Sequence, residues 1–473
     1  AYVAPETARA DTAPPVDRVP VVPDARDTLP PPADTTPAPL DTTRDEREAG
    51  STSVDAAIVD SASLVDSNLS RDGGAAIDGA RSPVPRIIAP QIPPADAEAL
   101  AADNAAFAFA AYQKIVASAD NVVFSPASIS IALAMTYAGA AGTTATEMAQ
   151  ALHFNLPPAR LHPAFNALDQ ALASRGEGKL GADDGPMRLD IVNSLWAEQT
   201  FSFRADFLDL LAAHYGAAVA LLDFLGAPEP SRQVINAWVA DQTEDKIRDL
   251  LPGDSIDKHT KLVLVNAVYL NARWKTVFQT SFDGPFTLLD DGKVTVKRME
   301  AVPLSVPVAQ STGLQAVSLP YADERLSLLV VVPEAGQFAQ VESTLDADGL
   351  GSIVASMTTK RVALTMPKFK IETTTKLGDV LQQLGMRAAF SPGADFSGMS
   401  EDGGLFIGGA YHKAFIDVGE KGTEAAAATA VVMKDASAPM VALYLTVDRP
   451  FLYYLRDDPT GAILFMGRVL DPS

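Results

Sequence analysis

The segment Glu420–Ser437 decides how the rest of the chain is interpreted, and it reads Glu-Lys-Gly-Thr-Glu-Ala-Ala-Ala-Ala-Thr-Ala-Val-Val-Met-Lys-Asp-Ala-Ser. Gly422 gives the backbone a pivot at little steric cost, and no proline interrupts the alanines that follow. With a period of two, the face suited to burial in a sheet comprises Thr423, Ala425, Ala427, Thr429, Val431 and Met433. Alanine nevertheless favours a helix over a strand. We interpret the segment as one that changes conformation, because its small side chains oppose neither state.

This segment resembles the hinge of the reactive-centre loop in serpins, the serine protease inhibitor family. The hinge positions that match are Glu420, Gly422, Thr423, Glu424, Ala425, Ala426, Ala427 and Ala428. The resemblance implies a suicide mechanism, in which a serine protease cleaves the loop and is trapped as an acyl-enzyme while the freed hinge inserts into the main sheet. The partner is then the target protease, held in a covalent complex, and the native state persists for kinetic reasons.

The reactive bond is placed by counting along the loop. In serpins the attacked residue usually lies sixteen positions beyond the hinge glutamate, which selects the bond between Ala436 and Ser437. Small Ala436 suits an elastase-like or subtilisin-like protease, because a shallow specificity pocket accepts alanine. The interval from Glu420 to Pro450 is a few residues longer than in many serpins, so Lys434 or Met433 are alternative positions. Lys434 would direct the loop to trypsin-like enzymes.

Further motifs follow in the order that serpins have them. They are Phe124-Ser125-Pro126, the helical stretch Ile235–Ile247, the apolar strand Lys261–Leu270 ending in Asn271-Ala272-Arg273-Trp274, the turn Asp448-Arg449-Pro450-Phe451, and the strand within Gly461–Val469. The resemblance covers roughly residues 96–473. It implies an α+β fold with three mostly antiparallel β-sheets, about eight to nine helices and an exposed reactive-centre loop.

Two sets of buried residues acquire roles only through this resemblance. A cluster under the centre of the main sheet, which controls whether the strands can part, is expected at Ser125, Ser128, Asn266 and His412. Hydroxyl, amide and imidazole groups suit this task because they can exchange hydrogen bonds without leaving a buried polar group unpaired. Trp274 matches the tryptophan at the end of the sheet where the loop enters. Without the resemblance, His412 and Trp274 are interpreted as ordinary core residues.

Residues 1–95 differ in composition from the rest of the chain. They contain 15 of the 34 prolines and a single aromatic residue, Tyr2. Such a stretch buries too little apolar surface to offset the entropy of ordering. We therefore expect a disordered tether over 1–95 and a serpin-like domain over 96–473. An alternative is that Ile87, Ile88 and Ile92 dock on the domain.

Composition excludes several classes of protein. The net charge of −22 argues against binding to nucleic acid or to an anionic membrane surface, and no apolar run is long enough to span a membrane. Cysteine is absent, so neither disulfides nor thiol chemistry are available. The basic residues Arg160, Arg175, Lys179 and Arg188 are scattered, which argues against activation by a heparin-type polyanion. The high alanine content and lack of cysteine favour a bacterial protein in the cell envelope or secreted from it, and we expect a monomer.

No motif indicates an enzyme. The chain lacks a Gly-x-Ser-x-Gly elbow, a His-Glu-x-x-His zinc motif, a phosphate-binding P-loop and a dinucleotide-binding fingerprint. Its five histidines do not have metal-ligand spacing. We therefore expect no catalytic residue, no metal and no cofactor. The competing interpretations are a non-inhibitory binding or envelope protein with a serpin fold, a hydrolase, and an inhibitor that blocks a protease without inserting its loop.

Overall fold

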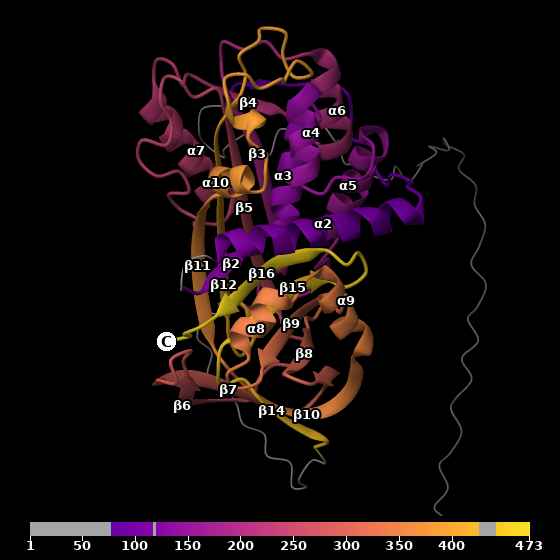
Figure 1. The fold of residues 1–473 in the computed structure, drawn as a ribbon, viewed down its shortest axis with the longest axis vertical. Helices are drawn as coiled ribbons and strands as arrows, with labels where there is room; N and C mark the ends of the chain where they lie inside the picture. Colours follow the sequence, from indigo (N-terminus) through magenta and orange to yellow (C-terminus); the bar gives the residue numbers. More distant parts are fainter. Residues whose placement is uncertain (1–76, 117–119, 425–440) are drawn as a thin grey trace, which may run out of the picture. The chain divides into compact units, whose positions relative to one another are not determined.

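The computed structural model describes residues 77–116, 120–424 and 441–473 (Figure 1). One sheet, here called the central sheet, has seven strands in the order β1-β4-β3-β5-β13-β12-β11. Their bounds are β1 Gly79–Ala80, β4 Val219–Leu222, β3 Arg188–Glu198, β5 Leu262–Arg273, β13 Gly422–Thr423, β12 Ile407–Val418 and β11 Phe369–Lys376. Most neighbouring strands are antiparallel, but β3–β4 and β5–β12 are parallel.

Strand β5 lies in the middle of the central sheet and is covered on both faces. Its even-numbered residues Leu262, Leu264 and Val268 belong to the larger hydrophobic core together with helix α3 (Pro126–Tyr137). Its odd-numbered residues Val263, Val265 and Ala267 belong to a second core together with helix α7 (Pro228–Gln242). The nearly continuous apolar run in the sequence is explained by these two cores, because both faces of the strand are buried.

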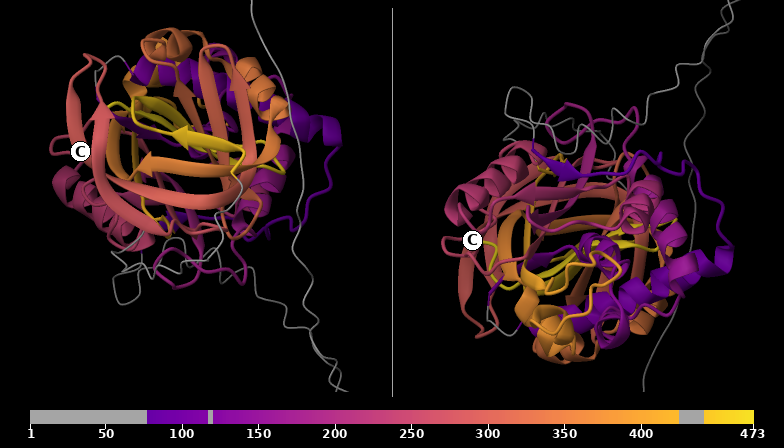
Figure 2. Two further views of the ribbon diagram at one scale, coloured as in Figure 1. Left: turned by 90° about the horizontal axis from the view of Figure 1, so that it is seen from below. Right: turned by 90° about the horizontal axis from the view of Figure 1, so that it is seen from above.

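The second sheet has nine strands. Eight follow the order β14-β10-β7-β8-β9-β15-β16-β2, and β6 pairs with β7. Their bounds are β14 Leu443–Thr446, β10 Thr358–Pro367, β7 Lys293–Ser311, β8 Leu314–Pro320, β9 Leu326–Pro333, β15 Phe451–Asp457, β16 Ile463–Val469, β2 Val122–Phe124 and β6 Thr280–Thr287. Seen from below in Figure 2, the salmon and orange strands curve around the yellow strands near the C-terminus.

The described strands are joined by hydrogen bonds into two sheets, where three were expected. The reason is the length of β7, whose 19 residues exceed an ordinary strand. Its first part pairs with β6, its middle with β10 and its last residues with β8. A single strand therefore connects what would otherwise be two separate sheets. The prediction of an α+β fold with mostly antiparallel pairing is confirmed.

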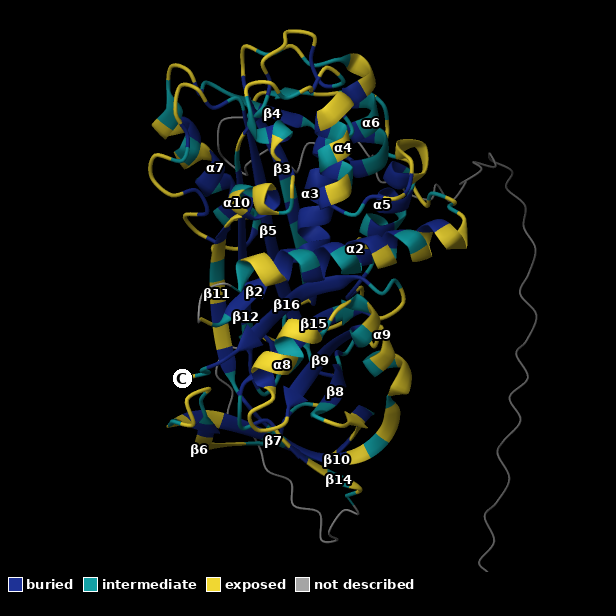
Figure 3. Cartoon of the chain, viewed as in Figure 1, coloured by how far each residue is buried: buried dark blue, intermediate teal, exposed yellow. Residues whose placement is uncertain are grey.

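The described residues form nine α-helices, in agreement with the expected number. Besides α3 and α7 they are α2 Pro94–Ile115, α4 Gly142–Ala151, α5 Pro158–Ala173, α6 Ala205–Tyr215, α8 Phe338–Thr344, α9 Ala347–Ser356 and α10 Leu377–Gln383, with a short 3-10 turn at Ala388–Phe390. Helices α2, α3, α5 and α7 each begin with proline, whose fixed φ suits the first helical turn. Figure 3 shows exposed positions along the outward sides of the helices and buried strands behind them.

Helix α7 ends at an earlier residue than the helical stretch expected over Ile235–Ile247. It ends at Gln242 because Glu244 and Asp245 have positive φ angles of 48° and 62°, which no α-helix accommodates. The buried Thr243 Oγ1 donates to the carbonyl of Val239 and accepts from the amide of Ile247 at 3.1 Å. The segment after α7 is therefore held in a defined conformation rather than continuing the helix.

The segment from Ile77 to Pro93 contacts the domain, although the tether was expected to extend to residue 95. Strand β1 pairs with β4. Arg86 forms an ion pair with Asp169 on α5, and the amide of Ile87 donates to the carbonyl of Ala213 at 2.9 Å. The side chains of Ile87 and Ile88 are exposed, whereas Ile92 is partly buried and packs against the larger hydrophobic core, so this segment is held by backbone and polar contacts together with Ile92. The folded region thus includes residues that composition alone assigned to the tether.

Candidate functional site: a fork in the central sheet

The central sheet is forked between β5 and β12. The two strands pair directly and in parallel from Ile407 opposite Leu262 to Ala414 opposite Val268. Beyond that point β13 lies between them, with Gly422 opposite Arg273 and Thr423 opposite Ala272 on β5. Thr423 is also opposite Val418 of β12. The first residues of the expected hinge are therefore already part of the sheet.

Gly422 is required at this position by its close approach to β5. A Cβ atom there would lie 2.0 Å from the carbonyl oxygen of Ala272, far inside van der Waals contact. Only glycine lets the backbone come this close. The pivot inferred from the sequence is therefore also a steric requirement of the pairing.

Thr423 points into the core at the end of the fork. Its side chain is buried, and its hydroxyl is hydrogen-bonded to the hydroxyl of Tyr321. The Tyr321 ring stacks on Trp274 with 4.4 Å between centroids, and the Trp274 indole donates to the carbonyl of Gly419 at 2.9 Å. Burial raises the pKa of Tyr321, so its hydroxyl stays neutral. Trp274 therefore lies at the point where the hinge residues meet the central sheet.

The expected sheet-opening cluster comes together under the directly paired part of β5 and β12. His412 Nε2 accepts from the amide of Ser125 at 3.0 Å, which leaves Nδ1 to donate to the side-chain oxygen of Asn266. The Asn266 amide group in turn donates to Ser128 Oγ. Burial lowers the pKa of His412 to about 3, so the imidazole is neutral at physiological pH. All four predicted residues are brought into one hydrogen-bonded group.

Two further residues extend this cluster, and the sequence analysis did not identify them. Asn193 on β3 accepts hydrogen bonds from Asn266 and from Ser128. Strand register places Asn193 opposite Asn266, Asn266 opposite His412, and His412 opposite Thr375 on β11. A row of polar side chains therefore crosses four strands at one level. An alternation of polar and apolar residues around Asn193 was visible in the sequence, but nothing there indicated its partners.

This arrangement can support separation of β5 from β12. The hydroxyls of Ser125 and Thr375 are buried and accept or donate no hydrogen bond among the described residues. They are available as new partners for His412 or Asn266 when the two strands move apart. Because a buried polar group without a partner costs free energy, such exchange lowers the cost of opening the sheet.

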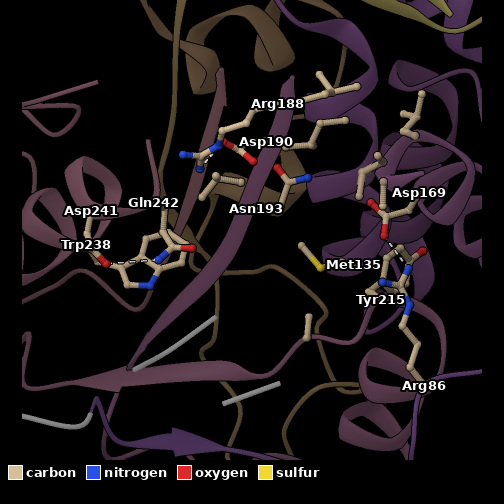
Figure 4. A pocket seen from close by; sticks show the side chains of 17 residues that line it. Arg86, Met135, Asp169, Arg188, Asp190, Asn193, Tyr215, Trp238, Asp241 and Gln242 are labelled. Atoms are coloured by element: carbon tan, nitrogen blue, oxygen red, sulfur yellow. Dashed lines mark hydrogen bonds and ion pairs between the residues drawn. The ribbon is translucent and has the colours of Figure 1, made fainter. Parts of the chain in front are cut away.

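A cavity of about 390 Å³ adjoins the polar row beside β3 (Figure 4). It is lined by Asn193, by Met135 of α3, by Tyr215, and by the ion pairs Arg188–Asp190 and Arg86–Asp169. Four of its charged side chains form these two ion pairs, and Asp241 is a further charged residue in the lining.

The remaining predicted positions lie outside the described residues. These are the hinge alanines and the candidates for the reactive bond, namely Ala425, Ala426, Ala427, Ala428, Met433, Lys434, Ala436 and Ser437. Within the described ranges, no group of three or more histidine, aspartate or glutamate side chains could hold a metal ion. No helix in this part of the chain combines the length and apolar character needed to cross a bilayer.

The first hinge residues thus lie between two strands of the central sheet, and a row of polar side chains crosses the directly paired part of the same strands. Comparison with known proteins identifies the family. A family model described as Serpin (serine protease inhibitor) matches residues 102–472. The chain belongs to the serpin family.

Relatives with similar sequences include both uncharacterised and named serpins. An uncharacterised serpin-like protein of Thermococcus kodakarensis is 38% identical over 371 residues, covering 78% of this chain and 84% of the relative. The leukocyte elastase inhibitor of Bos taurus is 36% identical over 387 residues, covering 79% of this chain and 100% of that protein. The similarity thus extends over nearly the whole described region.

Solved structures lead to the same family. The native state of the thermophilic serpin tengpin has a TM-score of 0.72 and 28% identity, covering 83% of this chain and 97% of tengpin. Human thyroxine-binding globulin in complex with thyroxine has a TM-score of 0.71 and 30% identity, covering 80% of this chain and 100% of the globulin. The structure neighbours therefore include a thyroxine-binding globulin, and the sequence relatives include proteins named as leukocyte elastase inhibitors.

Proposed function

We propose that this protein is a suicide inhibitor of serine proteases rather than an enzyme. The observation that carries the proposal is the position of Gly422 and Thr423 between β5 and β12. A hinge that already occupies the fork needs only the next residues to follow for the loop to become a full strand. The similarity to leukocyte elastase inhibitors supports a target protease as the partner.

The chemistry of trapping is supplied by the protease. Its serine oxygen attacks the carbonyl carbon of Ala436, the bond from that carbon to the nitrogen of Ser437 breaks, and the serine proton is transferred through the protease histidine to the new amine. What this protein itself determines is the rate at which its hinge inserts into the sheet. The acyl-enzyme persists only if the hinge inserts before water completes hydrolysis.

The loop sequence favours elastase-like or subtilisin-like targets, because Ala436 fits a shallow specificity pocket. Cleavage after Lys434 instead would imply trypsin-like targets, and Met433 is a further alternative. We also propose a monomer located outside the cell or in the cell envelope. These finer assignments depend on the loop and on the composition of the chain.

The test is to mix the protein separately with pancreatic elastase, subtilisin and trypsin and to examine each mixture on denaturing gels. A stable covalent band is expected, with a released C-terminal fragment whose mass corresponds to a start at Ser437. A start at Asp435 would move the site to Lys434, and a start at Lys434 would move it to Met433. Protease with a chemically blocked active-site serine is the control and should form no band.

The outcome that would contradict the proposal is complete cleavage of the loop with no covalent band and full residual protease activity across a wider panel. The competing function, a non-inhibitory binding or envelope protein, would then account better for the fold.

A further inference from the structure

Glu424 ends the paired part of the hinge, and its charged side chain is largely buried. The side chain of Glu424 is only 11% exposed. The backbone of Glu424 has φ of +59°, a left-handed conformation that costs free energy in a residue other than glycine. Its amide donates to the carbonyl of Asp417 on β12. A favourable interaction is therefore needed to offset the free-energy cost of the left-handed backbone and of the buried charge.

A second carboxylate, that of Asp417, lies close to Glu424. The pKa of Asp417 is raised, chiefly by burial and further by the negative charge of Glu424. Lys370 approaches Asp417 at 3.8 Å, but its side chain is 67% exposed, so solvent screens the pair. Lys368, which also acts on Asp417, is engaged by Glu420 at 3.1 Å. The carboxylates of Glu424 and Asp417 therefore lie close together at the fork.

Lys246 is a cation that interacts with both carboxylates. Its ammonium group forms an ion pair with Glu424, and its positive charge also lowers the pKa of Asp417. Burial raises the pKa of the Tyr269 hydroxyl on β5, and the nearby Glu424 carboxylate raises it further. The neighbouring Arg188 lies over the Tyr269 ring and is engaged by Asp190 and Glu244. Lys246 is therefore the cation in direct contact with Glu424 among the described residues.

The segment that carries Lys246 is anchored by buried residues on both sides. Thr243 and Ile247, on either side, are fully buried and hydrogen-bonded to each other at 3.1 Å. The positive φ angles of Glu244 and Asp245 direct this segment away from the axis of α7. The ammonium group is thereby placed at the fork without further ordering of the backbone.

We propose that Lys246 is a positioning residue for loop insertion, which holds the first hinge residues in the sheet before the protease arrives. Without its charge, Glu424 is left buried opposite Asp417, and the hinge is released from the fork. Insertion must then begin with re-entry of Thr423, which slows it relative to hydrolysis of the acyl-enzyme. This inference rests on the proposed function.

The test compares Lys246→Met, Lys246→Arg, Glu424→Gln and the double variant Lys246→Met/Glu424→Gln. Lys275→Met is the matched control, because Lys275 lies next to Trp274 but pairs with the exposed Glu324. We expect Lys246→Met to raise the number of inhibitor molecules consumed per trapped protease about fivefold. Lys246→Arg and Lys275→Met should stay within about twofold of the unmodified protein. In the Glu424→Gln background, removal of Lys246 should change the ratio less than about twofold.

Amide hydrogen exchange at Gly422 and Thr423 provides a readout that does not depend on any protease. Exchange should accelerate in Lys246→Met but not in Lys275→Met. If the unmodified protein traps no protease, the proposed function fails, while the exchange measurement still decides whether Lys246 holds the hinge. Unchanged exchange and an unchanged ratio in Lys246→Met would overturn the inference. An effect of Lys246→Met that is equally large in the Glu424→Gln background would overturn it too.

Discussion

The centres of the two sheets differ in what lies at the interface between neighbouring strands. In the central sheet, β5 and β12 are parallel, and a row of polar side chains crosses them at Asn193, Asn266, His412 and Thr375. In the second sheet, β9 and β15 are antiparallel, and Leu328–Val332 of β9 are buried and aliphatic throughout. Polar side chains thus cross the directly paired part of β5 and β12, whereas β9 in the second sheet is apolar throughout this stretch.

The largest expected effect comes from Thr423→Arg. This change forces a guanidinium against the buried rings of Tyr321 and Trp274, so the hinge cannot occupy the fork. We expect the yield of covalent complex to fall by about a hundredfold or more, with the protein cleaved as a substrate. Denaturing gels with the protease that the unmodified protein traps will measure it. Thr423→Ser, which keeps the hydroxyl, is the control. Normal trapping by Thr423→Arg would contradict the proposed role of the hinge.

A core substitution in the second sheet should lower the stability of the protein without changing how it traps a protease. Leu329 of β9 is fully buried between Ser318 and Tyr454. Leu329→Ala leaves a cavity and is expected to lower the free energy of unfolding by about 2–5 kcal/mol. Urea denaturation measures that loss, and gels measure the division between trapped and released protease, which should not change. If Leu329→Ala changed the ratio of trapped to released protease as much as a fork variant does, the two sheets would not differ in their role in trapping.

The polar row should make stability dependent on pH. His412 has its pKa lowered to about 3 by burial, whereas an unfolded histidine titrates near 6.5. Below pH 6.5 the unfolded chain therefore binds a proton that the folded chain does not, so stability falls as the pH is lowered towards 3. The loss from this residue should be about 2 kcal/mol at pH 5.

Urea denaturation of the unmodified protein and of His412→Gln at pH 7 and pH 5 measures this contribution. His162, whose pKa burial lowers to about 4, contributes a loss of the same sign that both proteins share. The exposed His259 provides the control variant, His259→Gln, which should behave like the unmodified protein. Equal losses on acidification in His412→Gln and in the unmodified protein would show that His412 is not the group responsible.

The smallest effect is expected at an edge of the second sheet. Lys297 on β7 and Asp283 on β6 form a cross-strand ion pair at 2.8 Å, but both side chains are mostly exposed. Lys297→Met should change the free energy of unfolding by less than about 1 kcal/mol, and it should leave trapping intact. A larger change in urea denaturation would mean that charge at this edge matters more than the solvent exposure of the pair suggests.

The sequence predicted the parts of the site that lie within recognisable motifs. Ser125, Ser128, Asn266, His412 and Trp274 are each embedded in such a stretch, and the structure brings them to the expected places. The α+β class and the mostly antiparallel pairing followed from the mixture of strands and helices.

The residues that were missed depend on contacts between distant segments. Tyr321 meets Thr423, and Lys246 meets Glu424, only because the fold aligns the hinge with β5 and with the segment after α7. Lys246 was also assigned to the expected helix, whereas α7 ends at Gln242 and the positive φ angles of Glu244 and Asp245 redirect the chain before Lys246. Backbone pairing of β1 with β4 could not be read from proline-rich composition, because backbone hydrogen bonds leave little trace in side-chain patterns.

Thermal unfolding of the protein before and after a single cut between residues 425 and 440 tests most directly whether the central sheet accepts the loop as a strand. If the freed hinge continues from Thr423 between β5 and β12, the cut protein gains strand hydrogen bonds and buried surface. Its unfolding temperature should then rise by roughly 20 °C or more. An unfolding temperature that stays the same or falls after the cut would contradict insertion, and with it the proposed mechanism of inhibition.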